Sequence, residues 1–135
     1  MTRSPRKWGM VCLIALGWSC VAARATDLNG AWASEEAVCD KIFQKTKNVI
    51  SIRRASDFHG SGFIIDNNQI RGKMAKCSIK SRKEEGDLVH LIAVCSTDIA
   101  LSTVQFSLKV DGDNRLTRIF PGMPEMSMSY VRCRI

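Results

Sequence analysis

The chain has 135 residues, of which 45% are hydrophobic and 24% charged, a composition typical of a single globular domain. Its formal net charge is +7, but four of its 20 basic residues and none of its 13 acidic residues lie before residue 26. Removing those four leaves 16 basic against 13 acidic residues, a net charge of +3. This weak charge is unlike that of nucleic-acid-binding proteins, and we expect no nucleic-acid partner.

Residues 1–25 are typical of a cleavable secretory signal peptide. Three basic residues come first, an apolar stretch from Trp8 to Val21 follows, and Ala23 and Ala25 form the small-x-small pattern that signal peptidase requires. The apolar stretch is shorter than the roughly 20 residues of a membrane-spanning helix. We therefore expect cleavage after Ala25, a periplasmic or secreted domain over residues 26–135, and no transmembrane segment in the mature protein.

Lipidation at Cys20 is the alternative to cleavage after Ala25. A lipoprotein signal has a leucine and two small residues before the cysteine, whereas Trp18 stands in that segment of this chain. The alanine pattern therefore predicts the mature N-terminus at Thr26.

The mature domain is expected to begin with a strand over residues 26–32, in which Trp32 is a large core anchor and a candidate ligand contact. A short amphipathic helix is predicted next, over residues 34–45. Ser34 is its expected N-cap, two glutamates follow in its first turn, and apolar side chains recur at helical spacing as far as Phe43. It is the one helix that the sequence predicts.

From residue 48 onwards, apolar and polar residues alternate with the period of two that is typical of β-strands. Tight turns are expected where Asn, Asp or Gly favour a reversal of the chain, at 67–68, 83–86 and 111–114. The predicted strands cover residues 48–52, 61–66, 69–71, 72–82, 87–96, 100–110, 116–120 and 127–134.

These elements predict a mainly β fold, an antiparallel meander that curls into a small barrel or a strongly bent sheet, with one short N-terminal α-helix. Residues 88–94 are apolar on both faces apart from His90, so we expect a central strand there. The helix is expected to cover one face of that strand, and His90 to lie in the core or the barrel interior.

Four cysteines follow the signal peptide: Cys39, Cys77, Cys95 and Cys133. An even number of cysteines in an oxidising compartment predicts two disulfides. A zinc site is the alternative, but the chain has no C-x-x-C or C-x-x-H pair to begin one.

The favoured pairing is Cys77–Cys95 and Cys39–Cys133. Cys77 and Cys95 lie on the same face of two strands joined by a turn, and the expected hairpin register makes them diagonal neighbours. A shift of two residues would place them directly opposite one another, at the separation that a disulfide needs. Cys39 on the helix then remains for Cys133 on the last strand.

Gly30 and Trp32, in the segment Asn-Gly-Ala-Trp, resemble the G-x-W motif in the first strand of lipocalins and of the wider calycin superfamily. The resemblance implies a β-barrel with a calyx for a small ligand. The helix directly after Trp32 and the shorter chain depart from the lipocalin pattern. Residues 33–43 and 119–126 are also similar to small exported alphaproteobacterial proteins of uncharacterised function, a resemblance that implies no activity.

Met123, Met126 and Met128 place three thioethers close together near the C-terminus. Soft sulfur ligands select Cu(I), and this spacing allows them to converge on one ion. The alternative is that they fill gaps in the core, since Met126 and Met128 share a strand face with Tyr130.

A cluster of potential catalytic side chains, Ser56, Asp57, His59 and Ser61, lies in a polar segment between two predicted strands. A hydrolase would need a nucleophile and a base in a recognisable frame such as G-x-S-x-G, which this segment lacks. We therefore expect a solvated loop and no enzymatic activity.

Lys76, Lys80 and Arg82 alternate with apolar residues and so are expected on one side of a strand. Such a basic face could dock an acidic protein or an anionic envelope polymer, although a solvated outer face accounts for the same pattern.

The sequence as a whole predicts a non-catalytic exported binding module without a cofactor, whose partner is an envelope protein or a small apolar ligand. The alternative is a periplasmic Cu(I)-binding protein that uses the methionine segment. A cavity of roughly 300 Å³ or more behind Trp32 would favour the small ligand.

Overall fold

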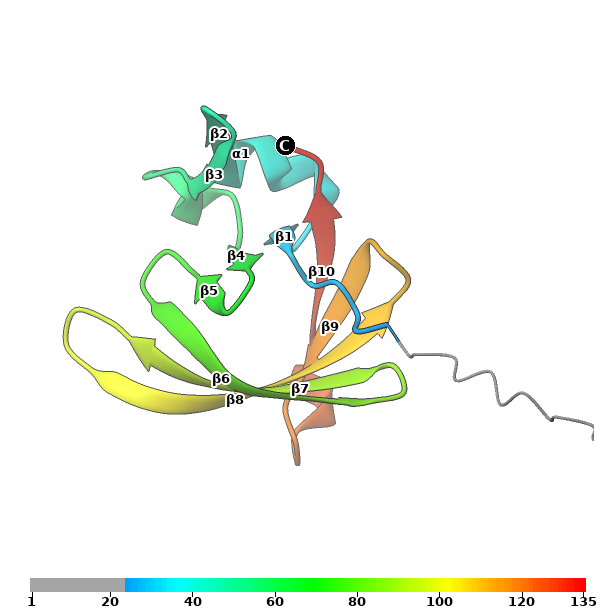
Figure 1. Cartoon of the computed structure of the whole chain (residues 1–135). Helices are drawn as coiled ribbons and strands as arrows, with labels where there is room; N and C mark the ends of the chain where they lie inside the picture. Colours follow the sequence, from blue (N-terminus) through cyan, green and yellow to red (C-terminus); the bar gives the residue numbers. More distant parts are fainter. Residues whose placement is uncertain (1–23) are drawn as a thin grey trace, which may run out of the picture.

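The computed structural model describes residues 24–135, in which eight strands form a closed antiparallel barrel (Figure 1). A two-stranded hairpin and a short α-helix lie outside this barrel. The expected fold class, a mainly β antiparallel meander that curls into a barrel, is confirmed, but the short helix follows the first strand and is not N-terminal. Residues 1–23, and with them most of the predicted signal peptide, lie outside the described residues.

The barrel consists of β1 and the seven strands from β4 to β10, and the hairpin consists of β2 and β3. The strands are β1 (Gly30–Ala33), β2 (Phe43–Thr46), β3 (Val49–Ile52), β4 (Gly62–Asp66), β5 (Gln69–Arg71), β6 (Lys76–Glu85), β7 (Leu88–Ser96), β8 (Leu101–Asp111), β9 (Arg115–Ile119) and β10 (Met128–Cys133). The helix is α1 (Cys39–Ile42), and the 3-10 turns are η1 (Glu36–Val38), η2 (Ser56–Phe58) and η3 (Pro124–Met126).

β1 closes the barrel because it pairs with both ends of the meander. The strands from β4 to β10 pair in sequence order, and β1 then joins β10 to β4. Trp32 in β1 is directly opposite Arg132 on β10 and Phe63 on β4. The closure gives every barrel strand a partner on both sides, which limits the free edge that would otherwise favour association with another chain.

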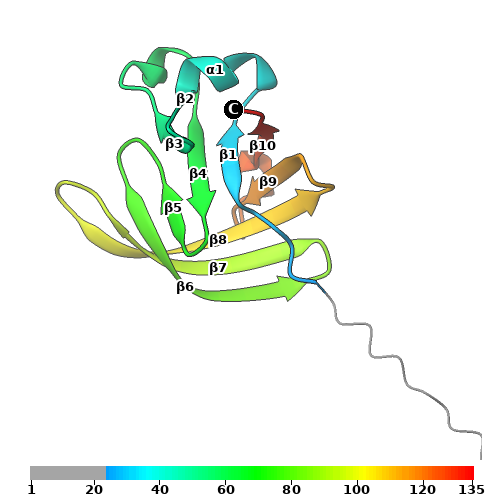
Figure 2. The ribbon, with the colours of Figure 1, turned by 45° about the horizontal axis from the view of Figure 1, so that its top comes forward.

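Each strand reverses the direction of the previous one, so the barrel has two ends with different connections. The end that we call the mouth has the connections 53–61, 72–75, 97–100 and 120–127. The opposite, closed end has the N-terminal segment 24–29 and the turns at 67–68, 86–87 and 112–114. In Figures 1 and 2, the hairpin loops β5–β6 and β7–β8 project to the left, whereas the turns after β6 and β8 lie to the right, beside the N-terminal segment.

The closed half of the barrel interior is filled by large apolar side chains. Trp32 is fully buried there, and its Nε1 donates a hydrogen bond to the carbonyl oxygen of Leu28 at 2.9 Å. Leu91 and Leu116, also fully buried, belong to the same cluster. This half is therefore a packed core that holds the strands together.

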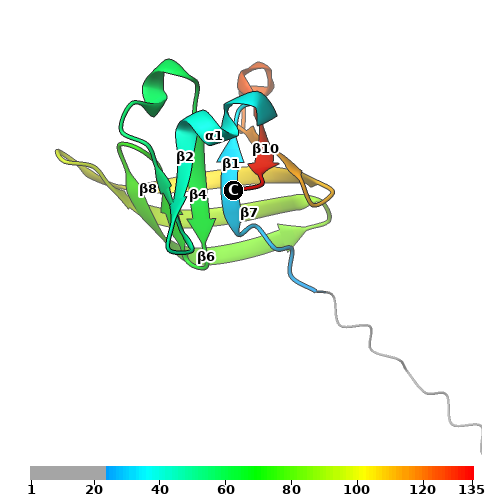
Figure 3. The same ribbon diagram turned by 90° about the horizontal axis from the view of Figure 1, so that it is seen from above.

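A second core lies outside the barrel, beneath α1 and the β2–β3 hairpin (Figures 1 and 3). Ala31 and Ala33 point outward from β1, and their small side chains let Ile42 and Phe43 pack closely against the strand. Gly62 serves the same purpose on β4, because a Cβ atom there would lie 2.8 Å from Cζ of Phe43.

The predicted helix over residues 34–45 is wrong in its second half. The α-helix ends at Ile42, and Phe43–Thr46 instead forms a strand that pairs with Val49–Ile52. Lys47 and Asn48 make the turn between them, with φ angles of 48° and 64°. Asn tolerates this left-handed conformation, and the turn allows the chain to reverse.

Two further expectations about the helix are also wrong. Ser34 does not cap it, since the residue before η1 is Glu35 and no side chain caps that turn. The helix packs on the outer core rather than on the strand that contains residues 88–94.

The strand over residues 88–94 alternates between the barrel interior and the outer face, so its two apolar faces have different surroundings. Val89 and Leu91 point inward, whereas Ile92 is exposed. His90 also faces outward, where its Nδ1 lies 3.0 Å from Oγ of Ser107. The expectation that His90 lies in the barrel interior is therefore wrong.

The turn predicted at 83–86 lies further along the chain. β6 extends to Glu85, and Gly86, with a φ of 61°, begins a two-residue turn to Leu88. Ion pairs of Lys83 with Glu85 and of Arg82 with Glu84 accompany the charged end of this strand. β6 also begins at Lys76 rather than at residue 72.

Both predicted disulfides are present. Cys77 lies directly opposite Cys95 on the neighbouring strand, with a Cα–Cα distance of 3.9 Å. Cys39–Cys133 joins α1 to β10, with a Cα–Cα distance of 5.6 Å. The expected diagonal register of the first pair is wrong by two residues, because the turn lies further along the chain and the register shifts between Ile79 and Ser81.

Candidate ligand-binding site

The mouth half of the barrel contains a cavity of about 360 Å³. Every barrel strand except β1 contributes to its wall, and most of the side chains that line it are apolar. The lining residues are Phe63, Ile65, Ile70, Gly72, Ala75, Cys77, Cys95, Thr97, Ser102, Val104, Phe106, Leu108, Arg118 and Tyr130.

The difference between the two halves of the barrel follows from the inward-facing residues along each strand. On β7 the inward positions run from Val89 and Leu91, in the packed half, to Ala93 and Cys95 towards the mouth. β8 runs in the opposite direction, so its inward positions begin with Ser102 and Val104 at the mouth and continue to larger residues towards the closed end. Small side chains near the mouth therefore leave a cavity there, whereas Trp32 and its neighbours fill the interior at the closed end.

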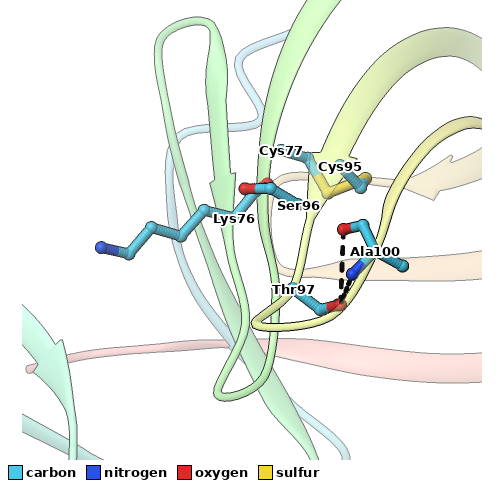
Figure 4. Close-up of a disulfide and its surroundings, with 6 residues drawn as sticks. All are labelled: Lys76, Cys77, Cys95, Ser96, Thr97 and Ala100. Carbon is cyan, nitrogen blue, oxygen red and sulfur yellow. Dashed lines mark hydrogen bonds between the residues drawn. A yellow bond between two sulfur atoms is a disulfide. The ribbon is translucent and has the colours of Figure 1, made fainter.

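The Cys77–Cys95 disulfide forms part of the cavity wall (Figure 4). It joins the mouth ends of β6 and β7, beside the turn from Thr97 to Ala100. Oγ1 of Thr97 accepts a hydrogen bond from the backbone nitrogen of Ala100 at 3.1 Å, which stabilises this turn. The covalent link and the turn together hold one side of the mouth in place.

Among residues 24–135, Arg118 is the one charged side chain that lines the cavity. Its guanidinium carbon lies 4.6 Å from the ring centre of Phe106 and 4.6 Å from that of Phe120. Within residues 24–135, no acidic side chain forms an ion pair with it. Burial lowers the pKa of Arg118 from its ordinary value, because an apolar environment disfavours the charged guanidinium.

Tyr130 is another polar residue of the cavity wall, directly opposite Leu116 on β9 and two residues from Met128. Its ring packs edge-on against Phe63, with ring centres 4.9 Å apart, and its hydroxyl lies 3.8 Å from the sulfur of Met128. A thioether is a weak acceptor, so this hydroxyl can exchange it for a stronger one.

Trp32 does not line the cavity. Its side chain is 0% exposed in the packed half of the barrel, so it is placed as a core anchor and not as a ligand contact. The cavity exceeds the expected minimum volume, but it lies towards the mouth rather than behind Trp32.

The three methionines of the C-terminal segment lie at the mouth end. Met123 and Met126 belong to the connection between β9 and β10, and Met128 is the first residue of β10. All three side chains are exposed, which differs from the buried position that a core role requires. Within the described residues, no group of three His, Cys, Asp or Glu side chains could hold a metal ion.

The structure places the predicted solvated loop around η2, between β3 and β4. Ser56 is buried, whereas Asp57, His59 and Ser61 are exposed. The side chain of Asp57 pairs with Nζ of Lys73 across the neighbouring connection. Asp57 thus links two loops of the mouth.

Lys76, Lys80 and Arg82 do not share one face, contrary to expectation. The register between β6 and β7 shifts between Ile79 and Ser81, so Lys80 lies at a bulge. Beyond the bulge, Arg82 is opposite the buried Leu91 and binds the carbonyl oxygen of Thr26 at the closed end.

Arg118 was not among the sequence-predicted site residues. The pattern that could have revealed it is the alternation of Leu116, Arg118 and Phe120, which puts a lone arginine on the apolar face of a strand.

No protein family, curated protein or solved structure matches this chain. None of the helices formed by residues 24–135 has the length and hydropathy of a membrane span.

Proposed function

We propose that this protein binds a small, largely apolar ligand that carries an acid group, in the mouth half of its barrel. The observation that carries the proposal is the position of Arg118, a cation without an acidic partner among the described residues, in the wall of an apolar cavity of about 360 Å³.

The apolar part of the ligand is inferred from the cavity wall. Ligand sites are concave, have volumes of roughly 300–1,000 Å³ and combine mainly apolar side chains with a few polar groups that fix orientation. The cavity has this volume and this character. Transfer of an alkyl chain from water into it would be favourable by about 25 cal/mol for each Å² of apolar surface that is buried.

The acid group is inferred from Arg118. A partly buried charge is costly unless it is paired, and contacts with Phe106 and Phe120 offset only part of that cost. A carboxylate or phosphate could accept two parallel hydrogen bonds from the guanidinium. Tyr130, in the same wall, could donate another.

Binding rather than catalysis is favoured by the chemistry of the cavity. Of the described residues, its polar side chains are Arg118, Tyr130, Thr97 and Ser102, and none of those that line it is a carboxylate or histidine that could act as a general base. We also propose that the protein acts outside the cytoplasm, which the two disulfides support because such bonds persist in oxidising compartments.

The test is displacement of a neutral, environment-sensitive naphthylamine dye by decanoic acid and by decanol, which share a chain length but differ in charge. Both should displace the dye, with decanoate the stronger. Arg118→Gln should weaken decanoate binding by about ten- to a hundredfold and leave decanol unchanged, because a hydrogen bond to a charged group contributes about 1.5–3 kcal/mol.

Two further variants make the test decisive. Arg115→Gln removes an exposed arginine of the same strand at the closed end and should have no effect. Val104→Trp should abolish dye binding by filling the cavity. The ligand-binding function is wrong if the dye does not bind or if Val104→Trp leaves its binding unchanged. Only the inference that the ligand carries an acid group is wrong if Arg118→Gln weakens the binding of decanoate and decanol equally.

A further inference from the structure

The exposed large apolar side chains of the described residues are concentrated at the mouth. Seven of the nine lie in its four connections or in the first residue of the strand that follows, and only Val49 and Ile92 lie elsewhere. The seven are Phe58, Met74, Ile99, Leu101, Met123, Met126 and Met128. They come from separate loops at the same end of the barrel, so they form a ring of apolar tips instead of one continuous face.

One side of this ring is also basic. We call it the basic lip and define it as residues 53–61 and 71–76. Its two apolar tips, Phe58 and Met74, are 88% and 75% exposed. Its only acidic residue is Asp57, against five basic residues: Arg53, Arg54, Arg71, Lys73 and Lys76.

Contacts within the basic lip hold its two segments together without neutralising most of its charge. Nζ of Lys73 binds both Asp57 and the carbonyl oxygen of Arg54. The side chains of Arg53 and Arg71 donate to backbone carbonyl oxygens. These bonds fix the positions of the two guanidinium groups, and no acidic side chain in the described part of the chain forms an ion pair with either of them.

The excess of positive charge also brings two basic residues, Arg71 and Lys76, next to one another. They are opposite one another on the paired strands β5 and β6. Like charges in this position repel and destabilise a sheet. An anion between them would relieve the repulsion.

We propose that the basic lip docks on the surface of an anionic lipid bilayer, with Phe58 and Met74 inserted among the head groups. Insertion of apolar side chains at loop tips into the boundary between head groups and acyl chains lowers the free energy, and anionic lipids attract the neighbouring cations. A ring of separate tips can enter a fluid surface, whereas a flat protein surface would meet it poorly. Docking in this way would bring the cavity opening against the bilayer.

This inference goes beyond the proposed ligand and does not depend on it. The ring and the basic lip lie on the outside of the molecule, whereas Arg118 lies in the cavity wall. Vesicle binding is measured without dye or decanoate, so either proposal can fail alone.

The experiment is co-sedimentation with vesicles of phosphatidylglycerol and with vesicles of phosphatidylcholine. The protein should bind the phosphatidylglycerol vesicles, release them at high salt, and bind phosphatidylcholine at least tenfold more weakly. Phe58→Ser combined with Met74→Ser should weaken binding by about tenfold or more. The matched control is Val49→Ser combined with Ile92→Ser, which removes the two exposed apolar side chains away from the mouth and should have no effect.

A second pair of variants tests the charge. Arg54→Gln with Lys76→Gln should weaken binding to phosphatidylglycerol, whereas Lys83→Gln with Lys109→Gln, which removes the same charge near the closed end, should not. All of these side chains are exposed, so circular dichroism should show an unchanged fold. The proposal is overturned if the protein does not sediment with phosphatidylglycerol, or if either control pair weakens binding as much as its counterpart in the basic lip.

Discussion

Arg132 covers the ring of Trp32 at the closed end of the barrel, with its guanidinium carbon 4.4 Å from the ring centre. The same guanidinium donates hydrogen bonds to the carbonyl oxygens of Asp113, at 2.7 Å, and of Asp27, at 2.9 Å, and also to that of Asn29. A single side chain from the last strand therefore binds both the N-terminal segment and the β8–β9 turn and holds them next to the buried indole.

Arg132→Lys should destabilise the protein by about 2 kcal/mol, because an ammonium group cannot stack on the indole or reach three carbonyl groups in the fixed geometry of a guanidinium. Urea denaturation followed by circular dichroism would measure the change. Arg134→Lys, at an exposed position two residues away, is the control and should be neutral. Equal effects of the two substitutions would show that Arg132 contributes only charge.

The two disulfides should differ in their contribution to stability. Cys39–Cys133 spans 94 residues and Cys77–Cys95 spans 18. In the chain-entropy description, stabilisation grows with the logarithm of the loop length, so replacing Cys39 and Cys133 by alanine should cost about 1.5 kcal/mol more than the same change at Cys77 and Cys95. Denaturant titration of the two double variants decides the order, and the reverse order would contradict the prediction.

The same variants should have the opposite order of effect on dye binding. Cys77 and Cys95 line the cavity, whereas Cys39 and Cys133 belong to the core outside the barrel. Alanine at Cys77 and Cys95 should therefore change the affinity for the dye, and alanine at Cys39 and Cys133 should not. A loss of dye binding only in the Cys39 and Cys133 variant would place the ligand outside the barrel.

The predicted cleavage after Ala25 can be related to a contact at the closed end. The backbone nitrogen of Thr26 lies 3.0 Å from Oε1 of Glu84. Cleavage would turn this amide into an ammonium group beside a carboxylate. We predict that the mature protein begins at Thr26, and mass spectrometry of protein from the periplasm would check this. A mass that corresponds to lipidated Cys20 or to an intact Met1 would contradict it.

The pKa of Glu84 should also lie below the ordinary value of a glutamate. Its pKa lies below the ordinary 4.5, chiefly because the side chain of Arg82 donates a hydrogen bond to the carboxylate, and also because of Thr26. A lowered pKa means that the ionised form stabilises the fold above pH 4.5, and that this stabilisation is lost as the pH falls through the lower value. A carboxyl titration by NMR should give a midpoint below 4.5 that rises in Arg82→Gln.

Cu(I) should bind weakly, if at all, to the methionine segment. The three thioethers are exposed, and the sulfur of Met128 already accepts the hydroxyl of Tyr130. Titration of Cu(I) against a competing chelator would measure the affinity. Sub-nanomolar binding that is lost in Met126→Ala with Met128→Ala would contradict this prediction and support the Cu(I)-binding alternative.

Most of the strands could be predicted from the sequence because alternation acts locally. Both disulfides could be predicted because a local hairpin pairs Cys77 with Cys95, which leaves Cys39 for Cys133. The predicted strand at 61–66, for example, is observed at Gly62–Asp66. The errors occurred where tertiary contacts override local preference. Phe43 follows the helical pattern, but its side chain is needed in the outer core, and the turn at Lys47 and Asn48 brings Phe43–Thr46 into a hairpin with β3.

The candidate site was harder to predict, for a different reason. Whether a barrel is filled depends on which inward-facing residues meet at the same level, and that depends on the register of every strand. The bulge between Ile79 and Ser81 changes the face of every later residue of β6. The position of Arg118 in the cavity wall therefore follows only from the closed barrel and not from its own strand.

The reversal of direction at each strand also bears on how this barrel could diversify. The contacts of Arg132 and the turns of the closed end lie at the opposite end from the connections 72–75, 97–100 and 120–127. Insertions and substitutions in these three loops could therefore accumulate without disturbing strand register. Loop grafting at the mouth should yield barrels with new ligands on an unchanged scaffold, in the way that antibody domains exchange their binding loops.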